Sequence, residues 1–127
     1  NRTGKKIMVC VTDQKVCEKL IYNALDILET SPGEIHVIHV SKDSVIKGEE
    51  SGEALEYLFG VCNKFDASLT LIKSDDILDS LVKSAIKNKI DTIIMGESRR
   101  ANPESSIIYE LKRKMGNKVD INVVPTI

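Results

Sequence analysis

The sequence has few aromatic residues and almost no net charge, which argues against one large class of partner. It contains no tryptophan, and aromatic residues make up 4% of its 127 positions. Its 18 basic residues nearly balance 19 acidic ones, for a net charge of -1. A nucleic-acid surface needs a basic excess, and a single-stranded target also needs aromatic rings for stacking. We therefore expect no nucleic-acid partner.

Long apolar runs are also missing. No run approaches the ~20 residues of a membrane span, and the N-terminal stretch lacks the apolar segment of a signal peptide. We expect a cytoplasmic protein, or the cytoplasmic part of a membrane-bound sensor, with no direct membrane insertion. The length suits one domain, so residues 1–127 are predicted to form a single unit. The first residue is Asn1 rather than Met, which leaves open excision from a larger sensor protein.

Cysteine and histidine are too few and too scattered for a disulfide framework or a metal site. Cys10, Cys17 and Cys62 are odd in number and include no CxxC motif, which favours a reducing compartment and buried, unpaired thiols. His36 and His39 lie three residues apart in an apparent strand, so their side chains point to opposite faces. We expect no metal site.

What the sequence does have is a regular alternation of short apolar runs and amphipathic stripes. The apolar runs span 6–11, 35–40, 69–72, 92–95 and 121–124, and stripes with helical spacing span 16–28, 54–65, 77–86 and 107–115. A polar stretch, 41–51, precedes the second stripe. Strands that are apolar on both faces need cover on both faces. The pattern predicts an α/β fold, a five-stranded parallel doubly wound sheet with helices on both faces.

In such a sheet ligands bind beyond the carboxyl ends of the strands, so the residues after each strand are candidates. The segment after the fourth strand is the most informative: Gly96 suits a close approach by a ligand, and Ser98, Arg99 and Arg100 follow it. Pro103 suits the first position of the next helix, whose N-terminus also favours anions. The segment predicts an anion site. The alternative is that both arginines are solvated or pair with the acids after the third strand.

Two further groups of residues allow more than one interpretation. Asp75 and Asp76 could pair as metal-binding carboxylates, but Asp76 also stands where an acid favours the start of a helix, which is the interpretation we prefer. A Ser/His/Asp arrangement is open as well, because polar side chains gather near the end of the second strand. These are His36, His39, Ser41 and Asp43. No G-x-S-x-G nucleophile motif accompanies them.

The segments KIMVCVTDQ, IHVIHV and IDTIIMGESRR resemble the universal stress protein family over roughly Lys5 to Pro125. Within the family, GESRR and the final strand are similar to the universal-stress-like domain of osmosensitive potassium-channel sensor histidine kinases (KdpD) of two-component systems. The resemblance implies the family's Rossmann-like fold and a nucleotide ligand near Thr12, Asp13, Val40 and Gly96. The family's ATP-binding pattern is altered, because Thr12 and Asp13 stand where it has Asp and Gly. Arg99 replaces its second glycine, and its Gly-Ser pair falls near Tyr109 and Glu110.

The resemblance and the arginine segment together predict a non-catalytic regulatory or sensory module. It would bind an anionic nucleotide, either an adenine nucleotide or a cyclic dinucleotide, or a kinase or transporter domain of the same or another chain, and require no cofactor. One alternative is a stand-alone universal stress protein that binds ATP weakly. Another is a phosphoacceptor receiver-like domain, for which Asp75 fits, but a single Asp13 stands where an acidic pair is needed and Pro125 where a lysine is needed. A third is an α/β hydrolase or reductase.

The last strand predicts a homodimer. An apolar strand at the edge of a sheet invites pairing, and universal stress proteins pair this edge with a second copy. We expect Ile121, Val123 and Val124 to lie at that interface. Pro125 limits its length because proline supplies no N–H.

Overall fold

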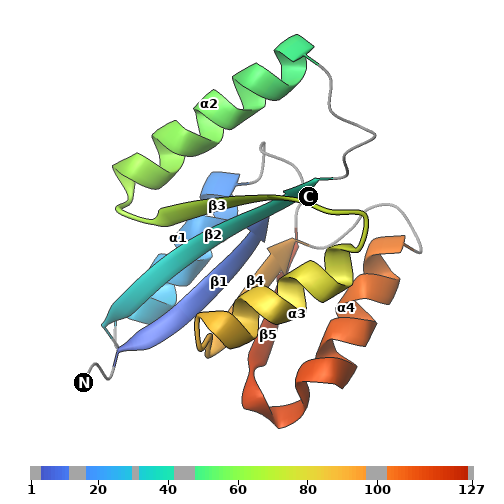
Figure 1. The fold of residues 1–127 in the computed structure, drawn as a ribbon. Coiled ribbons are helices and arrows are strands. Elements are labelled where there is room, and N and C mark those ends of the chain that lie inside the picture. The colour runs from blue at the N-terminus through green and yellow to red at the C-terminus, as the bar shows by residue number, and fades with distance from the viewer. Residues whose placement is uncertain (1–3, 12–16, 30–31, 42–47, 97–102, 126–127) are drawn as a thin grey trace.

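The computed structural model describes residues 4–11, 17–29, 32–41, 48–96 and 103–125. Five strands and four α-helices alternate along the chain in these ranges, as the apolar pattern predicts (Figure 1). They are β1 (Lys5–Val11), α1 (Cys17–Leu28), β2 (Gly33–Ser41), α2 (Gly48–Lys64), β3 (Ser68–Lys73), α3 (Ile77–Lys87), β4 (Thr92–Gly96), α4 (Pro103–Met115) and β5 (Asp120–Val124). A short 3-10 turn, Gly116–Lys118, joins α4 to β5.

The strands form one parallel sheet in the order β3-β2-β1-β4-β5. The predicted α/β doubly wound sheet is confirmed. The order also decides against the receiver-like alternative, because receivers have the flavodoxin-like order 2-1-3-4-5, in which the first strand lies between the second and the third. Here β1 lies between β2 and β4.

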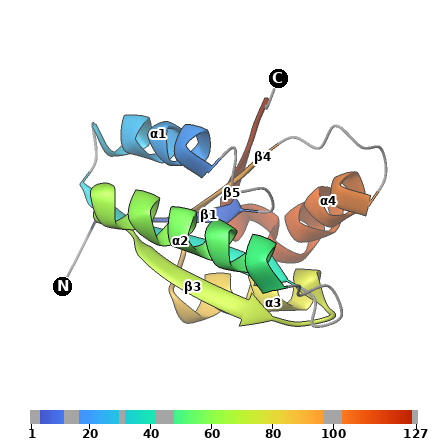
Figure 2. The ribbon, with the colours of Figure 1, turned by 90° about the horizontal axis from the view of Figure 1, so that it is seen from above.

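Each face of the sheet carries its own hydrophobic core. Along β1 the side chains alternate, so that Ile7 and Val9 enter a cluster with α1 and α2, whereas Met8 and Cys10 enter one with α3 and α4. Seen from above in Figure 2, α1 lies on one side of the sheet and α3 on the other. The central strands are therefore buried on both faces, which is why they appear in the sequence as unbroken apolar runs.

Local sequence explains the start of α3 but places the start of α2 too late. Asp76 is the N-cap of α3, because its Oδ1 accepts a hydrogen bond from the Asp79 backbone N–H at 3.0 Å. This confirms the cap interpretation of Asp76. The helix α2 begins at Gly48, inside the polar stretch 41–51, and thus two turns before the first apolar residue of its predicted stripe. An apolar stripe marks only the buried part of a helix, so it places the start of α2 too late.

Candidate functional site

The sheet changes its winding direction between β1 and β4, and this point defines the candidate site. From β1 the chain winds outward to β2 and β3, then crosses back to β4 and outward to β5. The two crossovers leave adjacent strands in opposite directions, and ligands of doubly wound sheets bind beyond the carboxyl ends of the strands at such a point. The last register pair of β1 with β4 is Cys10 with Met95, so Val11 and Gly96 lie one residue further toward the edge.

Two of the predicted ligand-binding residues are described, and both lie at strand ends at this edge of the sheet. Val40 and Gly96 are described: Val40 is the penultimate residue of β2, and Gly96 ends β4 opposite Val124 of β5. Thr12 and Asp13, which follow β1, lie outside the described residues. Ser98, Arg99 and Arg100 lie outside them as well, between the end of β4 and the start of α4. The topology thus gathers the attachment points of the predicted site at one edge.

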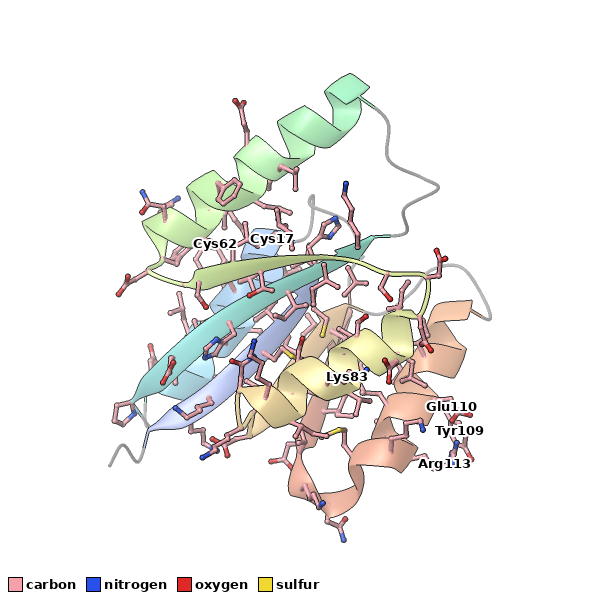
Figure 3. The ribbon with its side chains drawn as sticks, in the orientation of Figure 1. Cys17, Cys62, Lys83, Tyr109, Glu110 and Arg113 are labelled. Atoms are coloured by element: carbon pink, nitrogen blue, oxygen red, sulfur yellow. The ribbon has the colours of Figure 1, made fainter. Side chains whose placement is uncertain are left out.

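The start of α4 follows the prediction for this segment. The helix begins at Pro103, so proline occupies its first position, where a missing N–H costs nothing. Tyr109 and Glu110 lie well inside α4, where backbone N–H groups are used within the helix. Tyr109 is 65% exposed, and Glu110 pairs with Arg113 on the outer side of the helix (Figure 3). These two positions therefore do not supply the phosphate contacts that a Gly-Ser pair would supply.

Val40 lies near the end of β2, on the face of the sheet that α3 and α4 cover. It is half-buried and packs against the core cluster beneath α3 and α4. Its neighbour His39 belongs to the other face of the sheet, since side chains alternate along a strand. In the register of the sheet, His39 lies opposite Val11, the last residue of β1. The end of β2 thus presents an apolar side chain on one face and an imidazole on the other.

His39 makes a side-chain hydrogen bond at the switch point that the sequence did not reveal. Its Nδ1 lies 2.9 Å from the carbonyl oxygen of Val11. A carbonyl oxygen can only accept, so Nδ1 carries the proton and donates. The ring is half-buried and the Val11 side chain is 1% exposed. The contact follows from the parallel register of β1 and β2, which aligns Val11 with His39. The sequence alone does not show this register.

The other histidine, His36, belongs to a separate polar chain on the opposite face. Its Nε2 lies 3.0 Å from Glu34 Oε1, and its Nδ1 lies 3.2 Å from the hydroxyl oxygen of Ser68. Lys6 Nζ reaches Glu34 Oε2 at 2.8 Å. The Lys6 ammonium, through its hydrogen bond and its charge, lowers the pKa of the Glu34 carboxyl, and His36 adds to this effect.

The suggested Ser/His/Asp arrangement at the end of the second strand can therefore use at most one of the two histidines. Because His36 and His39 point to opposite faces, they cannot join one site. His36 contacts Ser68 and Glu34, and His39 contacts the backbone of β1. Asp43 lies outside the described residues.

The three cysteines lie in the cores, unpaired, as the sequence predicts. Cys17 at the start of α1 and Cys62 on α2 belong to the same core cluster, and Figure 3 labels both. Burial raises the pKa of the Cys10 thiol to about 12. Burial, with the neighbouring Cys62 and Glu18, raises the pKa of Cys17 to about 12 as well, and burial raises that of Cys62. A thiol is a weak nucleophile when it holds its proton, so these cysteines serve packing.

The described part of the chain offers neither a metal-binding cluster nor a membrane-spanning helix. Among these residues, no group of three or more His, Cys, Asp or Glu side chains is placed to hold a metal ion. No described helix has both the length and the apolar character to cross a membrane.

Comparison with known proteins places the fold. No protein-family model matches this sequence, and no curated protein matches it by sequence. Solved structures do match. The hypothetical protein MJ0577, a test case for structure-based assignment of biochemical function, is 18% identical with a TM-score of 0.74 over 99% of each chain.

Two similar structures contain nucleotides. A universal stress protein in complex with cAMP is 16% identical, with a TM-score of 0.66 over 99% of this chain and 100% of that one. The universal stress protein from Archaeoglobus fulgidus in complex with dAMP is 18% identical, with a TM-score of 0.62 over 95% and 96%. At these identities the match shows the fold alone. The chain has the universal stress protein fold along nearly its whole length.

Proposed function

We propose that this domain binds an adenine nucleotide at the carboxyl edge of its sheet, where β1 and β4 diverge, and acts as a non-catalytic regulatory module. One observation carries the proposal: structures with nearly complete overlap include universal stress proteins in complex with cAMP and with dAMP. Ligands of doubly wound sheets bind at such a switch point. The described site residues, Val40 and Gly96, lie at that edge.

The sequence of the edge supports an anionic ligand. Arg99 and Arg100 stand between Gly96, the end of β4, and Pro103, the start of α4. A guanidinium group can bind a phosphate through two parallel hydrogen bonds. Because Arg99 takes the place of a glycine of the ATP-binding pattern, a side chain rather than the backbone would contact the phosphate here. A monophosphate or cyclic phosphate suits this arrangement better than a triphosphate chain threaded along a glycine loop.

Two observations support a binding rather than a catalytic role. The buried thiols, with their raised pKa values, are poor nucleophiles. The carboxylate of Asp76 accepts a backbone N–H at the start of α3. These candidate reactive groups thus have structural roles.

We further propose that the domain is either a module of a sensor kinase or a stand-alone protein. The GESRR segment and the final strand favour a module of a potassium- and osmosensing two-component kinase. The structural matches fit a stand-alone universal stress protein equally well. The three unpaired cysteines suit a reducing compartment, which supports a cytoplasmic location in both settings.

A thermal-shift panel tests the proposed function. Wild-type protein is heated with AMP, cAMP, ATP and a cyclic dinucleotide, each with and without magnesium. A ligand at 100 times its dissociation constant stabilises a fold by about 2.7 kcal/mol, which shifts the melting temperature of a domain of this size by several degrees. We expect an adenine nucleotide to give such a shift and the double variant Arg99→Ala/Arg100→Ala to lose it.

The matched control removes two positive charges from the other end of α4. Lys112 and Lys114 are both exposed in its last turn, so Lys112→Ala/Lys114→Ala changes the net charge equally without touching the edge. The control should keep the nucleotide shift. A flat panel with wild-type protein would contradict nucleotide binding and favour docking of a partner domain. Equal loss in both double variants would show a general charge effect.

A further inference from the structure

We infer that His39 is a positioning residue of the nucleotide site, which holds the last carbonyl group of β1 in place through its Nδ1–H. This inference rests on the proposed function, because it names a part of the same edge. His39 is not a charged or phosphate-binding residue in this role. It acts on a bound nucleotide through the end of β1.

The geometry identifies Nδ1 as the nitrogen that makes the contact. The Nδ1 to carbonyl oxygen distance of 2.9 Å is that of a normal hydrogen bond, and the carbonyl requires a donor. The ring therefore carries a proton on Nδ1. Among the described residues, no side-chain nitrogen or oxygen is both buried and without a hydrogen-bond partner.

The carbonyl group that accepts this hydrogen bond belongs to Val11, at the point where β1 separates from β4. Val11 ends β1, and its register partner on β2 is His39 itself. The pairing of β1 with β4 stops one residue earlier, at Cys10 with Met95. At Val11 the strand is thus leaving its ladder with β4, at the switch point. A side-chain donor from β2 holds the backbone there, where a ligand of this edge would lie against it.

The second histidine of the chain shows that this is a property of position rather than of residue type. His36 lies on the same strand, yet its side chain hydrogen-bonds Glu34 and Ser68 on the opposite face. Its hydrogen bonds lie near the start of β3, away from the carboxyl edge. His36 therefore serves as an internal control for every experiment on His39.

Three substitutions separate the possible roles of the ring. Asparagine can place an N–H donor near the position of Nδ1, glutamine reaches nearer the position of Nε2, and leucine fills similar space without a donor. We expect His39→Leu and His39→Gln to weaken the affinity for AMP and cAMP about tenfold, which is the scale of one lost hydrogen bond. We expect His39→Asn to stay within about threefold of wild type, and His36→Leu to bind as wild type does.

The measurements are isothermal titration calorimetry with AMP and with cAMP, at a temperature where every variant is folded, and NMR of the ring nitrogens of His39. Rescue by asparagine alone, with a protonated Nδ1 in the spectrum, supports the inference. Unchanged affinity in His39→Leu would overturn it. Rescue by glutamine alone would also overturn it, because the ring would then act through Nε2.

Failure of the proposed function gives a different result. If wild-type protein binds neither nucleotide, the site is contradicted and the positioning role falls with it. The NMR spectrum then reports on the hydrogen bond alone. A proton on Nδ1 would show that His39 still holds the end of β1, whereas an Nδ1 without a proton would contradict the contact itself.

Discussion

The ion pair of Lys6 and Glu34 shows at the scale of single residues what an exposed charge contact contributes. The two side chains are 26% and 49% exposed, so solvent screens the pair and its effect on stability is small. Its effect on titration is easier to measure. Because the pair lowers the pKa of Glu34 in the folded chain, its contribution is present above the ordinary carboxyl value and is lost as the pH falls through the lowered one.

Replacing Lys6 should therefore change an acid titration in a defined direction. In Lys6→Met the pKa of the Glu34 carboxyl should rise toward its ordinary value, which NMR of the side-chain carboxyl carbon can follow. The stability difference between wild type and variant should shrink as the pH falls through that range. Lys83→Met removes a more exposed ion pair, with Asp79, and should leave Glu34 unchanged. An unmoved Glu34 titration in Lys6→Met would contradict the assignment.

Some residue-scale features could be predicted from the sequence, and others could not. The cap at Asp76 and the buried cysteines follow from local rules about helix starts and free thiols. The contact of His39 with Val11 depends on the register of two strands that are 28 residues apart in sequence. No local pattern carries that register, so the sequence showed His39 only as one of several polar residues near a strand end.

At the scale of elements, two glycines predict opposite effects of the same substitution. Gly33 begins β2 beside β1, and a Cβ at this position would lie 2.1 Å from the carbonyl oxygen of Lys5. Gly60 lies inside α2, where a Cβ would meet nothing within 4 Å. The first glycine permits two strands to approach each other, whereas the second only weakens a helix.

Alanine should therefore destabilise the protein at one position and stabilise it at the other. We expect Gly33→Ala to cost about 1–3 kcal/mol of unfolding free energy, as overpacking does. We expect Gly60→Ala to add about 0.5–1 kcal/mol, since glycine in a helix is less favourable than alanine by that amount. Urea unfolding of the two variants beside wild type measures both. Equal effects of the same sign would contradict the close approach at Gly33.

Element types were predictable because burial leaves its pattern in the sequence. Strands buried on both faces appear as short apolar runs, and helices with one buried face appear as stripes. The start of α2 was less accessible, because residues 48–53 carry acidic and small side chains rather than an apolar stripe.

At the scale of the whole molecule, the order of the strands decides where a site can form. Five parallel strands with right-handed crossovers allow more than one order, and periodicity does not choose among them. The order found here puts β1 and β4 side by side and brings the ends that precede Thr12 and Ser98 to one edge. The sequence identifies candidate residues, and the strand order determines which strand ends lie next to each other.

The sheet edge at β5 carries a prediction about assembly. β5 lies at one end of the sheet, its Val123 is 36% exposed, and Val124 is buried in the core beneath α1 and α2. We expect a dimer of twice the 14.1 kDa chain mass by analytical ultracentrifugation. Val123→Lys should shift it toward the monomer, because a charged side chain discourages edge pairing.

The control for the assembly experiment is an apolar side chain elsewhere on the surface. Ile86 of α3 is 64% exposed, so Ile86→Lys adds the same charge away from β5 and should leave the assembly unchanged. A wild-type monomer at high micromolar concentration would contradict the predicted interface.

The position of the nucleotide is the central claim, and a map of backbone amide shifts tests it most directly. Isotope-labelled protein is titrated with AMP and with cAMP, and two-dimensional NMR spectra are compared residue by residue. We expect the largest changes in amide chemical shift at the carboxyl ends of the strands, at Val11, Val40 and Gly96. The amide shifts of Gly33 and Thr92, at the amino ends, should not change. Changes centred on the amino ends, or no changes with either nucleotide, would contradict it.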